Sequence, residues 1–245
     1  MILNTLGSSS SGNCYLLQSD TEALIIEAGV RIDKIKQGLG YNLNKVAGCI
    51  VTHWHLDHSK SIPELLSAGI DVYALRSVFE AKGISNHHRA KIIEADKGYK
   101  VGNFKVFAFA VSHDVPCLGY LITHSETGSI LFLTDTFTCE YRFDNLSHVL
   151  IEANYADDVL NRNVESGRVP SVMRNRLLFS HMEIETTKTL LLAHDLSGVN
   201  TITLIHLSSD NSNEKRFIDT IQSATGKAVR AAYKGLEFTM NKEPY

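Results

Sequence analysis

A run of three histidines and one aspartate within six residues is the densest group of ionisable side chains in the chain. The stretch Thr52-His53-Trp54-His55-Leu56-Asp57-His58 follows an apolar, strand-like run and precedes a helix-like one. Imidazole and carboxylate groups are the ligands that zinc and similar divalent ions prefer. His53 and His55 can converge on one ion, while Asp57 and His58 turn toward a second. The spacing therefore predicts a binuclear metal site at a strand-to-helix turn, with a polar helix cap as the plainer alternative.

Three further ionisable residues each follow an apolar, strand-like run. His113 comes after residues 104–110, Asp135 after residues 130–134, and His206 after residues 201–205. Taken alone, a histidine at a strand end is more often a satisfied polar group than a ligand. Strand ends nevertheless gather at one edge of an α/β sheet, where such folds place their sites. We therefore expect these three residues to lie beside the first motif.

The elements that must position these residues are short β-rich runs that alternate with helical patterns. This alternation, with no repeat or linker between the halves, predicts one domain over residues 1–245: an αββα sandwich of two mixed β-sheets with helices outside. Residues 155–178 are polar and contain Pro170, which predicts a helical or irregular insertion between two strands. The expected strands are 14–18, 23–26, 49–52, 72–74, 104–110, 118–122, 130–134, 148–152, 201–205 and 236–240, and the expected helices are 32–38, 60–68, 77–82, 184–194 and 213–224.

The composition is that of an ordinary globular protein: 44% of the residues are hydrophobic, 21% are charged, and the formal net charge is −3. This balance lacks the broad basic face of a non-specific nucleic-acid binder, although a local groove can be positive within a negative whole. No apolar run reaches the length of a membrane span, and no signal-peptide pattern begins the chain, so we expect no membrane partner. The four scattered cysteines read as reduced thiols, which favours a cytoplasmic location.

The H-x-H-x-D-H run is similar to the signature of the metallo-β-lactamase superfamily, and the chain resembles that superfamily over nearly its full length. The resemblance implies an αββα four-layer fold with two divalent ions, zinc or manganese, with iron also allowed by the carboxylates. The implied ligands are His53, His55 and His113 for one ion, Asp57, His58 and His206 for the other, and Asp135 as the bridge.

Four other features resemble the YycJ/WalJ branch of metallo-β-lactamase-fold nucleases, a branch related to the PhnP cyclic phosphodiesterases. They are the glycine- and serine-rich start, the strand ending Glu152-Ala153-Asn154, a histidine just before a helix, and His206-Leu207-Ser208. In that branch the extra histidine approaches the substrate phosphate and is not a metal ligand, and His181 is the matching position. The hydroxyls and backbone N–H groups of the first loop are able to meet an anion beside the metals, with an ordinary hairpin turn as the alternative. The candidate substrate-binding residues are Ser9, Ser10, Asn13 and Asn154.

The chain departs from the branch in three places. Ser180-His181-Met182-Glu183-Ile184 stands where members commonly read G-H-L-S-N, and Tyr155-Ala156 stands where they carry His-Asp. In the I-D-A-G stretch near the start, Glu27 replaces the shorter acid, from where it would still brace the metal loop. These changes leave the expected metal ligands intact and bear on the substrate.

The resemblance predicts a binuclear phosphodiester hydrolase, a nuclease of DNA-exonuclease type, in which a metal-bridging hydroxide attacks phosphorus. His181 and Asp57 are the expected catalytic residues, with His181 donating a hydrogen bond or a proton to the substrate. The absence of a long insertion between Asp135 and His206 favours a small substrate or a DNA or RNA end. The alternatives are a carbon-ester hydrolase (a lactonase, thioesterase or β-lactamase) and a small cyclic-phosphodiester hydrolase. A di-iron redox protein is disfavoured because His55 stands where such relatives carry Glu, and a non-catalytic binding module because all seven ligands are present.

Overall fold

The computed structural model describes residues 1–243 and contains two seven-stranded sheets. The first sheet has the order β14-β1-β2-β3-β4-β5-β6, and the second has the order β13-β12-β11-β10-β9-β8-β7. The first sheet comprises β1 (Ile2–Gly7), β2 (Cys14–Gln18), β3 (Ala23–Ile26), β4 (Val46–Ile50), β5 (Val72–Ala74), β6 (Ala90–Ile92) and β14 (Glu237–Thr239). The second comprises β7 (Lys97–Val101), β8 (Phe104–Val111), β9 (Cys117–His124), β10 (Gly128–Leu133), β11 (Leu146–Glu152), β12 (Thr201–Ile205) and β13 (Ala228–Ala231).

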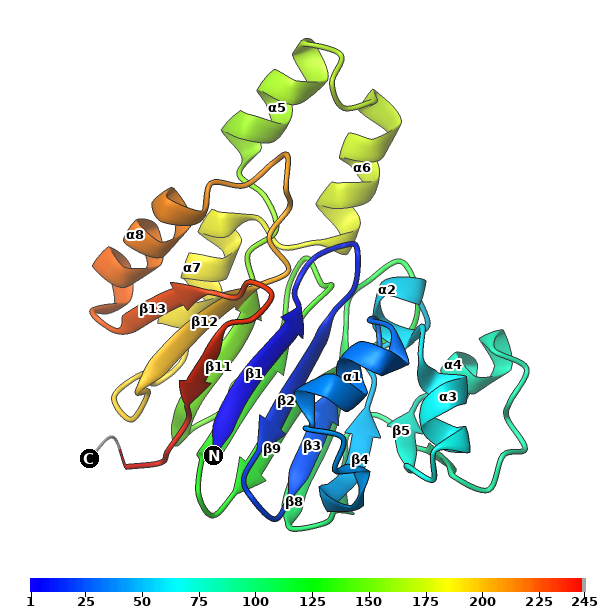
Figure 1. Cartoon of the computed structure of the whole chain (residues 1–245). Coiled ribbons are helices and arrows are strands. Elements are labelled where there is room, and N and C mark those ends of the chain that lie inside the picture. Colours follow the sequence, from blue (N-terminus) through cyan, green and yellow to red (C-terminus); the bar gives the residue numbers. More distant parts are fainter. Residues whose placement is uncertain (244–245) are drawn as a thin grey trace.

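Helices cover the outer face of each sheet (Figure 1). The outer layer of the first sheet contains α1 (Ile32–Gly38), α3 (Ile62–Ser67) and α4 (Arg76–Ala81), and that of the second contains α7 (Ile184–Leu192) and α8 (Glu214–Thr225). The short α2 (Leu56–Ser59) and the 3₁₀ turn η1 (Leu43–Lys45) complete the first half. The expected four-layer αββα sandwich is confirmed.

Three apolar clusters hold the four layers together. The central cluster joins the inner faces of the two sheets, where the ring of Tyr15 meets the ring of Phe132 edge-on at 5.6 Å between centroids. The second cluster packs α7 and α8 on one outer face, through residues such as Leu190 and Phe217, and the third packs the helices of the first half on the other. Burial of apolar surface on both sides explains why the central strands read as nearly continuous apolar runs.

The strand directions bring the chemistry-bearing residues to one edge of the sandwich. Strands β3 to β6 run parallel to one another, and so do β10 to β13. Strand β8 has the same direction as β10, because β9 is antiparallel to both. The carboxyl ends of these strands, where the segments after β3, β4, β8, β10, β11 and β12 begin, therefore open at the same edge.

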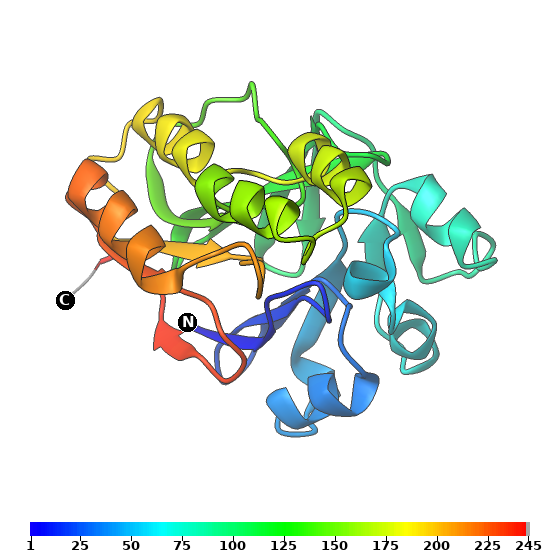
Figure 2. The ribbon, with the colours of Figure 1, turned by 90° about the horizontal axis from the view of Figure 1, so that it is seen from above.

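The segment expected to be a helical or irregular insertion forms two helices, α5 (Asp157–Glu165) and α6 (Ser171–Ser180). This helical pair lies over the edge where the strands end, as the view from above shows (Figure 2). Pro170 is the N-cap residue of α6, a place where its missing N–H costs nothing.

Element boundaries differ most from expectation around the metal motif. One helix over residues 60–68 was expected, but α2 begins at Leu56, directly after His55, and α3 begins separately at Ile62 with Pro63 in its first turn. Proline is well tolerated in a first turn but not within a continuous helix, so it separates the two. No helix within residues 1–243 is both long and apolar enough to cross a membrane.

Candidate metal centre

The first group of candidate ligands joins the loop after β4 to the end of β8. His53, His55 and His113 each offer a ligand atom within 4.8 Å of the others. The Nδ1–H of His113 donates to the backbone oxygen of Ser180 at 2.9 Å, which leaves its Nε2 facing His55 Nδ1 at 3.3 Å. Nε2 of His53 is buried and has no hydrogen-bond partner.

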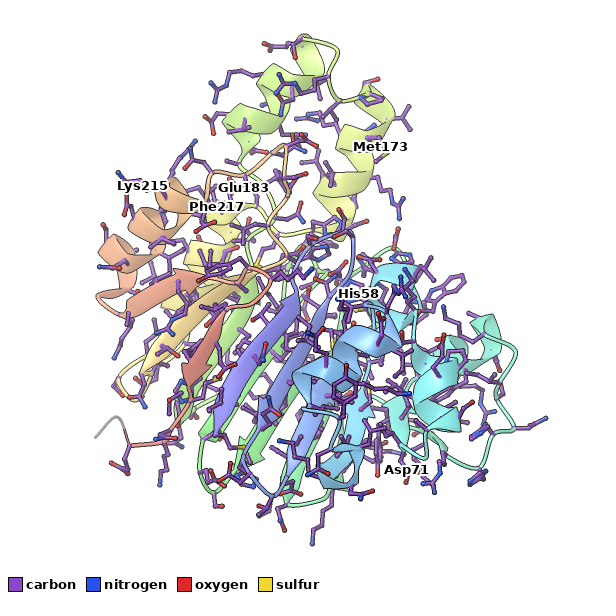
Figure 3. The ribbon with its side chains drawn as sticks, in the orientation of Figure 1. His58, Asp71, Met173, Glu183, Lys215 and Phe217 are labelled. Atoms are coloured by element: carbon purple, nitrogen blue, oxygen red, sulfur yellow. The ribbon has the colours of Figure 1, made fainter. Side chains whose placement is uncertain are left out.

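The second group comprises Asp57, His58, Asp135 and His206, whose ligand atoms also lie within 4.8 Å of one another. His58 Nε2 lies 3.3 Å from Asp57 Oδ2 and 3.3 Å from Asp135 Oδ1. The Nδ1–H of His206 donates to Asp135 Oδ1 at 2.6 Å, so that Nε2 faces Asp57 Oδ2 at 3.8 Å. His58 lies where α2 meets the sheet edge, below α6 (Figure 3).

Asp135 lies between the two groups. Its Oδ2 is 4.0 Å from His53 Nε2 in the first group, and its Oδ1 contacts His58 and His206 in the second. Burial alone would raise the pKa of Asp135, but His206 and His58 hold that pKa well below its usual range. This carboxylate is therefore charged, and its position between the groups is the one a bridging ligand requires.

The histidines of the two groups differ in electrostatics. Burial lowers the pKa of His53 well below its usual value, so His53 presents a neutral imidazole with a free lone pair. Burial also lowers the pKa of His58, but Asp135 and Glu27 outweigh it and raise that pKa well above the usual value. A buried lone pair, a concentration of imidazoles and a shared carboxylate fit the donor set of divalent metal ions.

Glu27 supports His58 from behind, as expected. Its Oε2 lies 3.4 Å from His58 Nδ1, and its Oε1 accepts the backbone N–H of Thr52 at 3.3 Å. The side chain is fully buried, and a carboxylate in this place fixes the tautomer of a ligating histidine. Glu27, Asp135 and His206 all adopt positive φ, at 66°, 51° and 54°. Such conformations cost free energy outside glycine and cluster at functional sites.

Gly29 lets two segments of the centre approach closely. A Cβ atom at this position would lie 1.6 Å from the backbone oxygen of Asp57. The same approach permits the backbone N–H of Asn13 to donate to that oxygen at 2.8 Å. The loop after β3 thus seats the turn that carries the metal motif.

His181 is held by a second buried carboxylate, Glu152. The Nδ1–H of His181 donates to Glu152 Oε1 at 2.7 Å, while Glu152 Oε2 accepts the backbone N–H groups of Thr136 and Met182 at 3.1 and 3.3 Å. Burial lowers the pKa of His181, but the charge and the hydrogen bond of Glu152, together with Asp135, raise it to about 9. A third set of ligand-type atoms within 4.8 Å joins His181 and Glu152 to Asp135 and His206.

A cavity of about 350 Å³ lies over this centre. His55, Asp57, Asp135, His181 and His206 all reach it. Its walls are the residues of α6 and the segment after β12, and Figure 3 shows Met173 on the α6 side.

The four expected substrate-binding residues occupy different places. Ser10 and Asn154 line the cavity over the centre, whereas Ser9 lines a neighbouring one. Asn154 Nδ2 also donates to the backbone oxygen of His206 at 2.8 Å. Asn13 is buried, and its Nδ2 contacts His58 Nε2 at 3.1 Å and Asp57 Oδ2 at 3.4 Å. Asn13 therefore braces the second ligand group.

Sequence reasoning did not select Asp114, which lies beside the first ligand group. Its Oδ1 is 3.0 Å from His113 Nε2 and 3.4 Å from His55 Nε2. Its Oδ2 pairs with Arg176 of α6 at 3.2 Å. The only local signal was its place next to His113. Sequence reasoning noted Glu152 only as the first residue of the E-x-N feature, because its hydrogen bond to His181 joins residues that lie 29 positions apart.

Comparison with known proteins agrees with this architecture. The fold and the edge-lying His/Asp groups define an αββα protein with a candidate metal centre. The family model for the metallo-beta-lactamase superfamily matches residues 9–138, more than half of the chain. The chain belongs to the metallo-beta-lactamase superfamily. Its buried His/Asp groups are consistent with the metal site typical of that fold.

Two curated relatives match most of the chain. The exodeoxyribonuclease YycJ of Bacillus anthracis is 28% identical over 226 residues, covering 85% of this chain and 83% of its own. The exodeoxyribonuclease WalJ of Streptococcus pneumoniae is 27% identical over 223 residues, covering 84% and 81%. The solved structure of the metallo-beta-lactamase fold protein YhfI from Bacillus subtilis has a TM-score of 0.72 at 18% identity over 97% of this chain and 99% of that one. A diphosphatase of the PhnP family has a TM-score of 0.67 at 15% identity over 97% and 96%. The two structures share the fold.

Proposed function

We propose that this protein is a binuclear metal-dependent phosphodiester hydrolase that acts on DNA ends. The observation that carries the proposal is His181, whose ring is anchored by Glu152 and opens onto the cavity beside Asp57, Asp135 and His206. The similarity to two exodeoxyribonucleases over more than four fifths of the chain supports DNA as the substrate.

In this proposal His53, His55 and His113 would hold one ion, Asp57, His58 and His206 would hold the second, and Asp135 would contribute to both. Divalent ions at such a site supply an activated water and neutralise charge that develops on a phosphoryl oxygen. Zinc or manganese fits the mixed nitrogen and oxygen donors. Glu27 and the backbone oxygen of Ser180 orient His58 and His113 so that each presents its Nε2 to the centre.

His181 acts on the substrate. Its Nδ1–H is committed to Glu152, so Nε2 is the nitrogen free to meet a phosphate oxygen or the leaving oxygen. A protonated ring donates a charge-assisted hydrogen bond there and can pass its proton to the leaving group. We also infer that Ser10 and Asn154 contact the non-reacting phosphate oxygens, a role supported by their place in the lining of the same cavity.

The first test is hydrolysis of bis(p-nitrophenyl) phosphate by protein reconstituted with zinc or manganese, beside a lactone and a thioester. His181→Ala is expected to lower kcat about 10²–10⁴-fold, the usual contribution of a general acid. His88→Ala is the matched control, because His88 is exposed in a loop, where its ring stacks on that of His87. Turnover of the carbon esters without the phosphodiester, or indifference to His181→Ala, would overturn the proposal.

The second test concerns the substrate. A single-stranded oligodeoxynucleotide labelled at its 5′ end, and a second labelled at its 3′ end, are incubated with the metal-loaded protein. An exonuclease releases a labelled mononucleotide at once from one of the two and a ladder of shortening products from the other. A circular single strand that is cut as readily as the linear one contradicts action at ends.

A further inference from the structure

A second cavity, about 680 Å³ in volume, adjoins the metal centre. Its walls come from the loop between β1 and β2, the start of α1, the loop between β12 and α8, and the turn between β13 and β14. Leu207, Ser208 and Ser209 line both this cavity and the one over the centre, so the two meet along that segment. The β13–β14 turn is tied to β1 by the backbone bond from Gly235 N–H to Thr5 O at 2.8 Å.

Cations dominate this second cavity. Arg31, Lys34, Lys60 and Lys234 line it and are exposed, and Glu214 is its one acidic lining residue. Within residues 1–243 no ion pair neutralises the three lysines, whereas Arg31 pairs with Asp33 at 3.1 Å. We call this cavity the basic groove. Because the whole chain carries a formal charge of −3, the groove is a local concentration of positive charge, which favours a polyanion.

Other groups in the basic groove fit a nucleic-acid strand. Tyr233, in the β13–β14 turn, is 57% exposed and presents an aromatic ring on which a base can stack. Ser11 and Ser212 add hydroxyls of the kind that bind phosphate oxygens. An exposed tyrosine in a groove that these lysines also line combines the two features of single-strand binding surfaces, stacking and backbone charge.

We propose that the basic groove holds the backbone of a DNA single strand whose terminal phosphodiester lies in the metal centre. This inference rests on the proposed function and deepens it. The substrate is then a strand with nucleotides beyond the reacting bond, since a small cyclic phosphodiester would leave the groove empty. Lys34 and Lys234 bind phosphates, and Tyr233 stacks on a base.

The test compares two double variants that each remove two positive charges. Lys34→Ala/Lys234→Ala alters the groove, and Lys100→Ala/Lys105→Ala alters exposed lysines that pair across β7 and β8 at the far end from His113. Binding of a fluorescein-labelled 12-nucleotide phosphorothioate single strand is followed by anisotropy at several salt concentrations. Hydrolysis of bis(p-nitrophenyl) phosphate is measured on the same preparations.

The groove variant is expected to bind the strand about tenfold more weakly and to flatten the slope of log K against log salt by about 1.4, from about 0.7 for each lost phosphate contact. Tyr233→Ala is expected to weaken binding about fivefold or more at any salt concentration, because it removes stacking. Hydrolysis of the small diester should be unchanged in all three variants. The control double variant should bind as the unaltered protein does.

Equal binding and equal salt slope in the groove and control variants would overturn this inference while leaving the proposed function standing. Absence of phosphodiester hydrolysis would overturn the proposed function, and the binding isotherms would then still decide whether the groove takes DNA. A groove variant that loses hydrolysis of the small diester together with strand binding would also contradict this inference, because the substitutions would then act through the metal centre.

Discussion

Replacing Glu152 with glutamine should slow phosphodiester hydrolysis, by no more than removing the His181 ring does. In the structure Glu152 uses both oxygens: one accepts from His181 Nδ1–H, and the other accepts the backbone N–H groups of Thr136 and Met182. Glutamine has one acceptor oxygen, and the two backbone donors require it. The NH₂ group of the glutamine must then face His181, so the His181 ring has to present a lone pair at Nδ1. The substitution also removes the negative charge that raises the pKa of His181.

The expected loss in kcat is about 10²-fold, the lower end of the range for a general acid, because a neutral ring can still donate one hydrogen bond. That factor corresponds to about 2.7 kcal/mol of activation free energy. Metal content is measured alongside, since Glu152 Oε1 also lies 3.7 Å from His206 Nδ1. We expect the metal content of the variant to be unchanged, so that the loss is in turnover.

Glu183→Gln is the matched control. Glu183 caps α7 by accepting the N–H groups of Glu185 and Thr186, a role that an amide oxygen also performs. The double variant Glu152→Gln/His181→Ala should be no slower than His181→Ala alone, because the two residues act as one unit. Turnover within about threefold of the unaltered protein for Glu152→Gln, or additive losses in the double variant, would refute the reasoning.

Three other outcomes follow from the geometry. Burial lowers the pKa of His148 to about 4, so the folded protein stays unprotonated at this ring while the unfolded chain binds a proton near pH 6.5. The free energy of unfolding should therefore fall by about 2 kcal/mol between pH 7 and pH 5. Urea titrations should show this fall in the unaltered protein and not in His148→Asn. Gly29→Ala places a methyl group against the Asp57 backbone oxygen, so it should lower both metal content and melting temperature, at a stability cost of about 2 kcal/mol or more. A methyl group at Gly40 meets no atom within 4 Å, so Gly40→Ala should cost about 1 kcal/mol and keep the metal. Metal at a hundred times its Kd should stabilise the fold by about 2.7 kcal/mol in calorimetry, and chelation or Asp135→Asn should abolish that gain.

The layered fold was predictable because its central strands carry an unambiguous pattern. Strands β2, β3, β5 and β12 occupy the residues expected for them, since each is a short, continuous apolar run bounded by polar residues. Strands β1, β6, β7 and β13 were not expected. They are short or polar, as in Lys97–Val101, and they form because neighbouring strands at or next to the sheet edges supply hydrogen-bond partners. The local sequence of these strands gives no sign of the strands with which they pair.

The candidate site likewise has features that the local sequence predicts and contacts that it does not. Asp57 and His58 were recognisable because their spacing is local, and Asp135 because it ends an apolar strand. Contacts that join distant segments were beyond sequence reasoning, such as the bond from His113 to the backbone oxygen of Ser180, 67 residues later. A backbone acceptor has no sequence signature at all, although it decides which imidazole nitrogen faces the centre.

In the loop between β1 and β2, the direction in which each side chain points decides its role more than its position in the motif does. Asn13 turns inward and contacts Asp57 and His58, while Ser9 faces the basic groove. Ser10, which lies between Ser9 and Asn13 in the sequence, lines the cavity over the metal centre. Because these residues face different cavities, substitutions within one short loop should separate the two activities we propose. Asn13→Ala should lower metal affinity, whereas Ser9→Ala should weaken strand binding and leave metal content unchanged.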